Sequence, residues 1–572
     1  MKKLTIILLL TPLLGLAQGL TTTTLSNGTW GDPLIWDNGL PSLSKSATIN
    51  HNVTITSNSQ TKHLTINDTL VNNGYLLETV NFINNGYYED YSGQVVIRQN
   101  GNISGNDTYF YNLSVKGGSL TNTSYVRNLL NVINGVFNIT SGNLVLVNDG
   151  IYDGRVGQCG GNVNGNMIWQ KHIVRDCQGW AMYSFPNSPT LSDIGFFYTG
   201  VIGGPWPNFW ANTYYYDETM TGGKEIGWTK YGNITQTVPQ GSGLFHYDSP
   251  KVEDVAFSVT MTNTFAYNIT YSPDTVASEI GWNLIGNPYP GTMDWDDPNW
   301  TKTNVANAIY TWSACKGGYD SYVAGVGTGD MDNLVPSGEA IWVQTIGTAP
   351  SLVVTKTALV DDSEPMMKKS NIDSNSLRVK LNGDDIIVRV KNGTEGFDYD
   401  LDAFKMGEGF LKTKDSEGNE YSINTLPNKQ QTISLWTRGS GTLQFELNDL
   451  QNSWKIYLED LYLNETQLLG DDYTFTSNTP QYEHRFNIIF TKKPLQVQYG
   501  INQLRLGIEE LQINYDIIYQ ESQVTIISDT LLNVEVYDIM GRLLQKNVGN
   551  SVVIPRNSIK FVYINGRVEK IF

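Results

Sequence analysis

Three carboxylates stand beside one tryptophan in the stretch Met293–Asp297. Aromatic rings flanked by acidic groups are typical of carbohydrate-binding grooves. The candidate ligand-binding residues are therefore Asp294, Trp295, Asp296 and Asp297. The three carboxylates also offer hard oxygen ligands for calcium, but they are not followed by a calcium loop with a distal Glu. The same residue types build the core and rim of a β-sandwich, and the sequence favours that structural interpretation.

Catalytic motifs are missing from the sequence. It contains no G-x-S-x-G, no H-E-x-x-H and no Walker loop. The histidines stand singly, at His51, His63, His172, His246 and His484. A glycosidase would need two carboxylates at a defined separation, which a sequence cannot supply. A triad assembled from distant residues stays open, but we expect no catalytic residues, no cofactor and no metal.

The three cysteines allow one disulfide. Cys159 and Cys177 could pair in an oxidising compartment, which would leave Cys315 over. Their spacing matches no zinc-binding pattern. The sequence leaves the Cys159–Cys177 bridge and free thiols as alternatives.

Composition indicates a multidomain all-β protein. The chain has 572 residues and a formal net charge of -18, which argues against nucleic acid as a partner. Only 16% of residues are charged, while there are 55 Gly and 32 Tyr. Such polar, turn-rich sequence favours many short strands, and the length predicts roughly three to five domains.

The first residues predict export. Lys2 and Lys3 precede an apolar run, Leu4–Leu16, and Ala17 follows it. This order is typical of a secretory signal peptide over residues 1–17. The run is too short and interrupted to span a membrane, and no later stretch reaches about eighteen apolar residues. We therefore expect no transmembrane segment.

Residues 18–150 predict a β-solenoid, with a β-sandwich as the alternative. Short alternating runs recur between Asn- and Gly-rich turns, for example at His63–Ile66, Gln94–Ile97 and Leu144–Val147. Neighbouring coils would bury each other's apolar side chains, and asparagines could form ladders at the corners. Trp30 and Trp36 are expected to cap the open end of the solenoid; a sugar-stacking platform is the other interpretation.

Residues 151–358 contain an internal duplication. Three pairs of similar stretches follow in the same order: Gly179–Pro186 with Gly281–Pro290, Ala211–Glu218 with Ala306–Ser313, and Val238–Tyr247 with Val335–Gln344. Each copy predicts a strand, a Pro-bounded loop, an aromatic strand and a return strand after Pro-x-Gly.

A linker and a β-sandwich are predicted next. Residues 359–376 are charged and small, as in a linker. Residues 377–493 contain seven alternating runs, which predict a sandwich. Within it, Arg485 and Asp402 form a candidate buried ion pair, with two solvated surface charges as the alternative.

Residues 494–572 predict a small antiparallel β-sandwich. Val534 and Val536 alternate with polar residues, short strands are expected at Leu543-Leu544 and Ser551–Ile554, and Asn565-Gly566 predicts a two-residue hairpin turn. The motif residues are Val534, Val536, Tyr537, Asp538, Gly541, Arg542 and Lys570. This V-x-V-Y-D-x-x-G-R pattern resembles the C-terminal (type A) sorting module of substrates of the Bacteroidetes type IX secretion system.

The resemblance implies a function and partners. It implies a secreted or cell-surface protein, associated with the outer membrane, whose partners are the outer-membrane shuttle and translocon of that system. We expect an adhesin or structural surface component that binds polysaccharide or another cell-surface protein. The alternatives are an accessory component retained at the secretion or gliding machinery, and a secreted enzyme acting on polysaccharide.

Overall fold

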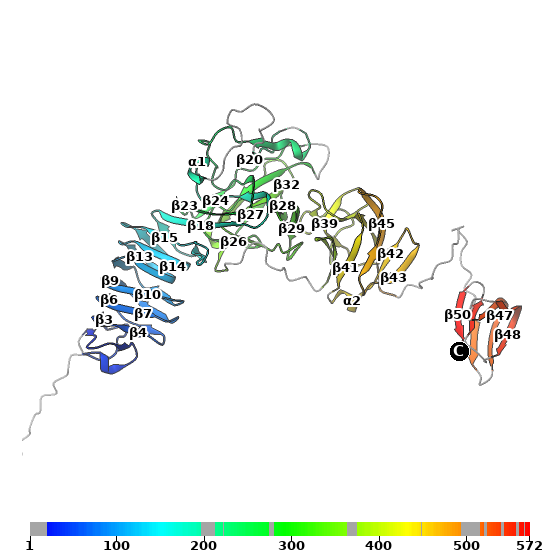
Figure 1. Ribbon diagram of the computed structural model, residues 1–572, viewed down its shortest axis with the longest axis horizontal. Helices are drawn as coiled ribbons and strands as arrows, with labels where there is room; N and C mark the ends of the chain where they lie inside the picture. The colour runs from blue at the N-terminus through cyan, green and yellow to red at the C-terminus, as the bar shows by residue number, and fades with distance from the viewer. Residues whose placement is uncertain are drawn as a thin grey trace, which may run out of the picture. The chain divides into compact units, whose positions relative to one another are not determined.

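The chain folds into two compact units of β-structure, Met1–Tyr499 and Gly500–Phe572 (Figure 1). The computed structural model describes residues 20–195, 212–220, 222–273, 279–362, 375–447, 449–493, 515–519, 523–538, 543–555, 560–564 and 567–571. The predicted all-β class is confirmed. The predicted signal peptide, Met1–Ala17, lies outside the described residues. None of the helices in the described residues is long and apolar enough to cross a membrane.

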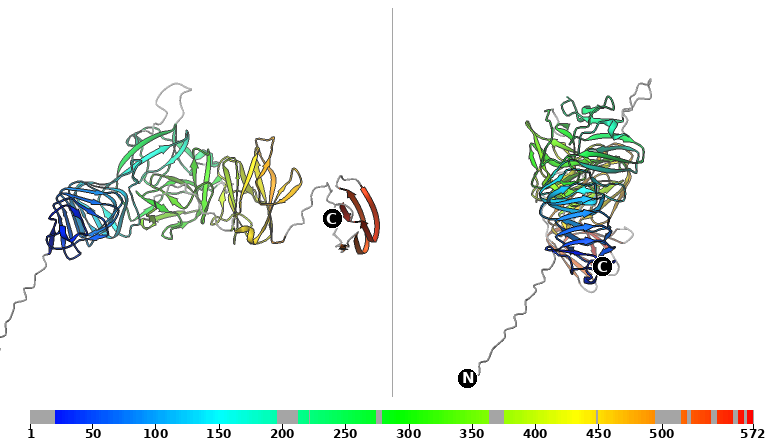
Figure 2. Two further views of the ribbon diagram at one scale, coloured as in Figure 1. Left: turned by 60° about the horizontal axis from the view of Figure 1, so that its bottom comes forward. Right: turned by 90° about the vertical axis from the view of Figure 1, so that its left-hand side faces the viewer.

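The first unit begins with a parallel β-solenoid that has three strand ladders (Figures 1 and 2). One ladder contains β1 (Thr21–Thr23), β3 (Ser46–Ile49), β6 (His63–Ile66), β9 (Asn81–Asn84) and β12 (Gly101–Gly105). The second contains β2 (Gly28–Thr29), β4 (Val53–Ile55), β7 (Thr69–Asn72) and β10 (Tyr87–Asp90). The third contains β5 (Ser59–Gln60), β8 (Leu76–Thr79) and β11 (Gln94–Ile97). The predicted solenoid is thus confirmed, and the sandwich alternative for this stretch is wrong.

Stacking of apolar side chains holds the coils together. Ala47 pairs with Leu64, Leu64 with Phe82, and Phe82 with Ile103, so a coil takes about 17 to 21 residues. All four side chains are buried in one core. Burial of each large aliphatic side chain contributes about 1.5 to 3 kcal/mol. The longer strands β13 (Thr108–Leu120) and β14 (Ser124–Ile139) continue the same parallel pairing.

Asparagines form the expected ladder at one corner. The Asn67 Nδ2 atom donates to Asn50 Oδ1 at 2.8 Å, and Asn85 Nδ2 donates to Asn67 Oδ1 at 3.1 Å. Each amide therefore satisfies its neighbour on the next coil, where backbone turns leave polar groups without ladder partners.

Trp30 and Trp36 lie in the core of the first coil. Each is only 4% exposed, and their rings meet edge to face with centroids 5.4 Å apart. Trp36 Nε1 donates to the Trp30 carbonyl at 3.1 Å. Both rings are covered, so they shield the end of the apolar core and cannot serve as a sugar-stacking platform.

The duplication predicted from the sequence is visible in the sheet topology. The first copy contains β19 (Gly179–Tyr183), β22 (Leu244–Asp248), β20 (Thr213–Tyr216) and β21 (Trp228–Lys230), in that spatial order. The second contains β25 (Trp282–Gly286), β32 (Ala340–Thr345), β28 (Val305–Ser313) and β29 (Gly318–Val323), in the corresponding order. All neighbours within each copy are antiparallel.

Residues 376–491 form a sandwich-like β-structure around a core of their own. Its strands include β35 (Ser376–Leu381), β36 (Asp384–Val390), β40 (Gln431–Arg438), β41 (Gly441–Leu447), β42 (Lys455–Asp460), β44 (Tyr473–Phe475) and β45 (Tyr482–Thr491), which match the seven predicted runs. The sequence did not predict β38 (Leu411–Lys414), β39 (Glu420–Leu426) and β43 (Glu465–Leu468). A further apolar cluster joins this sandwich to the second copy of the repeat, with Tyr310 and Phe404 among its members.

The predicted pairing of Arg485 with Asp402 is wrong. Arg485 Nη2 donates to Asp460 Oδ2 at 2.8 Å, and the two side chains are 8% and 2% exposed. The residues lie on the paired strands β45 and β42, where register brings them together. Asp402 instead accepts hydrogen bonds from the backbone N–H groups of Thr425 and Asp398, at 2.6 and 2.8 Å.

The buried carboxyl of Asp402 leads us to predict that the free energy of unfolding decreases as pH rises. Burial raises the pKa of Asp402 to about 7. Between its ordinary pKa and 7, the folded state holds a proton that the unfolded state has lost, so the free energy of unfolding decreases with rising pH. Urea unfolding between about pH 4 and pH 8 should show a loss of roughly 2 to 4 kcal/mol that Asp402→Asn removes. Asp400→Asn, at an exposed position of the same loop, is the control; an equal change in both variants would contradict the assignment.

The second unit is a small antiparallel β-module. It contains β46 (Tyr515–Tyr519), β47 (Gln523–Asp538), β48 (Leu543–Pro555), β49 (Lys560–Ile564) and β50 (Arg567–Ile571). Its core includes Val534 and Val536, as their alternation predicted. The two short strands expected at Leu543-Leu544 and Ser551–Ile554 are one strand, β48, because β47 is long enough to pair along its whole length.

Candidate functional site

The predicted ligand residue Trp295 is part of the core. Its side chain is fully buried, and its Nε1 atom donates to the Asn307 carbonyl at 2.8 Å. The Lys302 ammonium lies 3.7 Å from the centroid of the indole ring and donates to the Trp295 carbonyl at 3.0 Å. A ring covered in this way offers no face to a sugar, so the structural interpretation of this stretch is favoured.

The three neighbouring carboxylates accept hydrogen bonds from the protein, two of them from backbone N–H groups of the local turn. Asp294 Oδ1 accepts from the Asp296 backbone N–H at 2.8 Å, and Asp297 Oδ1 accepts from the Asn299 backbone N–H at 2.8 Å. Asp296 accepts a hydrogen bond from the Tyr322 hydroxyl. Burial raises the pKa of Asp296, and this hydrogen bond opposes the rise. The chain therefore does not bring these residues together around a ligand position.

Replacing Trp295 by phenylalanine tests its structural role. Trp295→Phe removes the indole N–H donor and leaves a small void, so we expect a loss of about 1 to 3 kcal/mol in the free energy of unfolding. Oligosaccharide binding, measured by titration calorimetry, should not change. Weaker binding with unchanged stability would restore the groove interpretation.

The disulfide joins a different pair of cysteines from the predicted one. Cys177 is bonded to Cys315, and Cys159 is a free, buried thiol. Cys159 lies in the solenoid core, whereas Cys177 follows β18 (Met167–Arg175), which leaves the solenoid beside the second repeat. Burial raises the pKa of the Cys159 thiol. The prediction was wrong because closeness in sequence did not reflect closeness in the fold.

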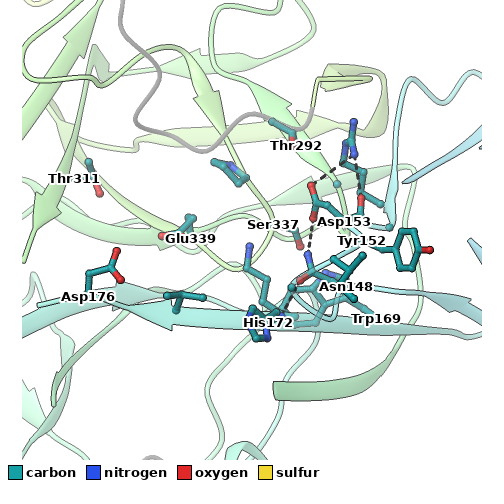
Figure 3. Close-up of a pocket in the computed structure, with 18 of the residues that line it drawn as sticks. Asn148, Tyr152, Asp153, Trp169, His172, Asp176, Thr292, Thr311, Ser337 and Glu339 are labelled. Atoms are coloured by element: carbon teal, nitrogen blue, oxygen red, sulfur yellow. Dashed lines mark hydrogen bonds and ion pairs between the residues drawn. The ribbon is translucent and has the colours of Figure 1, made fainter. Parts of the chain in front are cut away.

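A cleft of about 650 Å³ lies where the last solenoid coil meets the second copy of the repeat (Figure 3). Its residues come from two distant parts of the chain, 148–176 and 291–339. Figure 3 shows β18 along one wall, with Trp169, His172 and Asp176, and the second copy along the other, with Thr311 and Glu339. The volume falls in the range of small-molecule sites, which are mostly about 300 to 1,000 Å³.

Strand β18 supplies the first wall. It pairs antiparallel with β23 (Lys251–Val259) along its whole length, and this pairing fixes the direction of its side chains. Trp169 is 2% exposed and packs against Phe257. His172 Nδ1 is hydrogen-bonded to Asp254 Oδ1 at 2.7 Å.

The turn Pro336–Glu339 and strand β28 supply the second wall. Burial raises the pKa of the half-buried Glu339 carboxyl, while the nearby Lys171 ammonium lowers it. Gly338 has a φ of 92°, a backbone conformation that glycine tolerates, and an added Cβ there would contact the Trp169 ring at 3.5 Å. The turn thus holds Ser337 and Glu339 close to the opposite wall.

Several buried polar atoms around the cleft have no hydrogen-bond partner. Within the described part of the chain, these are Ser337 Oγ, Trp312 Nε1, Arg155 Nε and Arg175 Nη1. Ser337 is 8% exposed, and both arginines are 7% exposed. Ser337, Trp312 and Arg155 line the cleft, and Arg175 lines a connected hollow of about 400 Å³ that shares Trp312 and Glu339. Such unsatisfied groups are uncommon in native interiors, so each calls for a partner or another reason.

The sequence did not identify this cleft. An indication of the cleft lay in the second copy of the duplicated stretch, Val335–Gln344. Its Ser337 and Glu339 stand where the first copy has other residue types. His172 was noted only as one of the single histidines. The two walls are far apart in the chain, so only the tertiary fold reveals that they meet.

The motif residues of the terminal unit are only partly described. Val534 and Val536 are buried on β47, and Lys570 belongs to β50. The backbone of Tyr537 and Asp538 continues β47. Gly541 and Arg542 lie outside the described residues, as does the predicted Asn565-Gly566 turn, but its flanking residues Ile564 and Arg567 pair as a hairpin requires.

Comparison with known proteins adds no family. Neither a scan against protein-family models nor a search of curated proteins found a match to the chain. Among the residues that the structure describes, there is no group of three or more His, Cys, Asp or Glu side chains that could hold a metal ion. Functional inference therefore depends on the cleft and the terminal unit.

Proposed function

We propose that this chain is an exported cell-surface protein, an adhesin or structural component, delivered by the type IX secretion system through its terminal unit. The observation that carries this proposal is the terminal unit itself. It forms a compact β-module with a separate core, in which Val534 and Val536 of the sorting motif are buried. A small module with a core of its own suits a sorting signal that other proteins recognise.

The disulfide gives independent support for export. Disulfides persist in oxidising compartments and are rare in a reducing cytosol. The Cys177–Cys315 bond joins the start of the first repeat to the second repeat. It therefore fits a protein that folds after leaving the cytoplasm.

The proposed partners are the outer-membrane shuttle and translocon, which would bind the edges and loops of the terminal unit. The first unit would then stand at the cell surface and contact polysaccharide or another surface protein. Retention at the secretion or gliding machinery is the second candidate. A polysaccharide-acting enzyme is the third, favoured only by the raised pKa of Glu339 in a cleft.

Removing the terminal unit tests delivery. A variant lacking Gly500–Phe572 should fold its first unit, because that unit is compact and has hydrophobic cores of its own, but it should remain inside the cell envelope. Protease added to intact cells should digest the full-length protein and spare the variant. Equal digestion of both would contradict delivery by this unit, provided that their thermal unfolding is the same.

A further inference from the structure

We propose that Lys302 and Asn307 form a covalent isopeptide bond, which the folded chain makes from these two side chains. The bond would join β27 (Thr301–Thr303) to β28 across the turn at Asn304, which has a φ of 53°. This modification site goes beyond the proposed function and does not depend on it. It can be tested on the purified chain.

The amine of Lys302 lies among uncharged partners. Nζ is 3.0 Å from the Trp295 carbonyl oxygen, 3.0 Å from Asn307 Oδ1 and 3.7 Å from the centroid of the Trp295 ring. Among the residues that the structure describes, no carboxylate lies within ion-pair distance of this nitrogen. A lysine amine that is withdrawn from water normally has such an ionic partner, so this environment is unusual.

The environment favours the neutral amine. Burial lowers the pKa of Lys302 to about 8, although the charges of Asp296, Asp294 and Asp400 act in the opposite direction. At pH 8 about half of the molecules therefore carry a neutral amine at this position. The neutral amine is the nucleophilic form of lysine, and withdrawal from water is one way in which proteins activate it.

The carboxamide of Asn307 is the electrophile within reach. Its carbon is bonded to Oδ1, so a small rotation of the amide brings it into the range of about 3 to 3.5 Å from Nζ in which attack occurs. The backbone of Asn307 is held on both sides, because its N–H donates to the Tyr399 carbonyl at 2.9 Å and its carbonyl accepts from Trp295 Nε1 at 2.8 Å. Asn307 Nδ2 lies 3.5 Å from the Asp400 carbonyl, which is too long a contact to hold the amide firmly.

Asp296 can move the proton that the reaction requires. Of the charged groups near Lys302, it acts most strongly on the amine. Although much of Asp296 is exposed, its Oδ2 atom accepts a hydrogen bond from the Tyr322 hydroxyl, which holds the carboxyl in place. Burial of the carboxyl end raises its pKa, so this group can take up a proton and release it again.

The reaction exchanges one amine for another at the Asn307 carboxamide. The Nζ–Cγ bond forms, and the Cγ–Nδ2 bond breaks. Asp296 takes a proton from the attacking amine and gives it to Nδ2, which leaves as ammonia. No oxidant, reductant or other co-reactant is consumed. The product is an amide bond between the two side chains, and the chain is lighter by one ammonia.

Peptide mapping of the purified, unaltered chain tests the bond. After reduction and denaturation, trypsin should fail to cleave after Lys302, because the cross-linked side chain no longer carries a free amine. The segments Val252–Lys302 and Thr303–Lys316 should therefore appear as one peptide that is lighter by one ammonia than the sequence requires. Two separate peptides with the masses of unmodified Lys302 and Asn307 would overturn the proposal.

Lys356 provides a control within the same digest. Its buried amine also contacts an asparagine side chain, that of Asn162, but no carboxylate is among the groups that shift its pKa. Trypsin should cleave after Lys356, which shows that digestion is complete and that a hydrogen bond alone does not block cleavage.

Two variants identify the reacting groups. Asn307→Ala removes the electrophile and Asp296→Asn removes the proton carrier, so each should restore cleavage after Lys302. Asp297→Asn changes a neighbouring carboxyl that accepts from the Asn299 backbone N–H, and it should leave the cross-link in place. A cross-link that persists in Asp296→Asn would contradict the assigned proton transfer. The decisive result comes from the unaltered chain, so it stands whether or not a variant folds.

Discussion

Replacing both Cys177 and Cys315 by serine is expected to lower the free energy of unfolding by about 2 to 5 kcal/mol. The bond closes a loop across 138 residues of sequence, so its loss releases a large part of the unfolded chain from constraint. It also borders the hollow that continues the cleft, where it holds β18 against the hairpin of β28 and β29.

Chemical denaturation under non-reducing conditions measures this effect. The comparison is the unaltered chain with the double variant, and Cys159→Ser serves as the cysteine control. That change alters a buried side chain, so its cost of about 1 kcal/mol should be insensitive to reductant. If reductant destabilised the unaltered chain no more than the double variant, the Cys177–Cys315 bond would be absent.

Breaking the ion pair of Arg378 should have an effect of similar size. Arg378 is 4% exposed and donates to Asp385 Oδ2 at 2.6 Å. It also donates to the carbonyls of Gly327 and Gly329, at 2.8 and 2.9 Å, and so joins the sandwich to the second repeat. Arg378→Met removes this donor from a buried carboxylate and from two carbonyls. We expect a loss of about 3 to 5 kcal/mol in the free energy of unfolding.

The neighbouring Lys380 is a matched control on the same strand. Its side chain is 38% exposed and pairs with Glu446, which is 38% exposed as well. Lys380→Met removes a solvent-accessible pair, so the expected cost is below about 1 kcal/mol. The two variants should be compared by urea unfolding at one pH. Equal costs would show that burial does not govern the contribution of the Arg378 pair.

Local patterns predicted the strands well where one face is buried. In β3 and β6 of the solenoid, inward Ala, Leu and Ile alternate with polar residues, so the sequence itself shows the period of a half-buried strand. The duplication could also be recognised in the sequence, because both copies contain similar stretches in the same order. Strands β38 and β39 were missed because nearly all of their residues are buried. They therefore lack the alternation of apolar and polar residues that identifies a half-buried strand.

Pairings between distant residues could not be predicted. Arg485 was assigned to Asp402, but it forms an ion pair with Asp460, which lies opposite the adjacent residue Phe486 on the paired strands. Cys177 was assigned to the nearer Cys159, but the chain turned it towards Cys315. Trp295 carried the residue types of a sugar site, yet burial made it a core residue. In each case residue type was informative, and the partner depended on tertiary contacts that a single sequence does not encode locally.

The mass of the protein recovered from the cell surface tests the central claim of delivery most directly. Intact mass spectrometry and mapping of the terminal peptides would be applied to protein released from washed cells. Delivery through the terminal unit predicts a surface form that begins after Ala17 and lacks the residues after about Gln496. Recovery only of an intracellular form that retains both Met1 and Phe572 would contradict export. A surface form that keeps Phe572 would contradict removal of the terminal unit after delivery and would favour retention at the outer membrane.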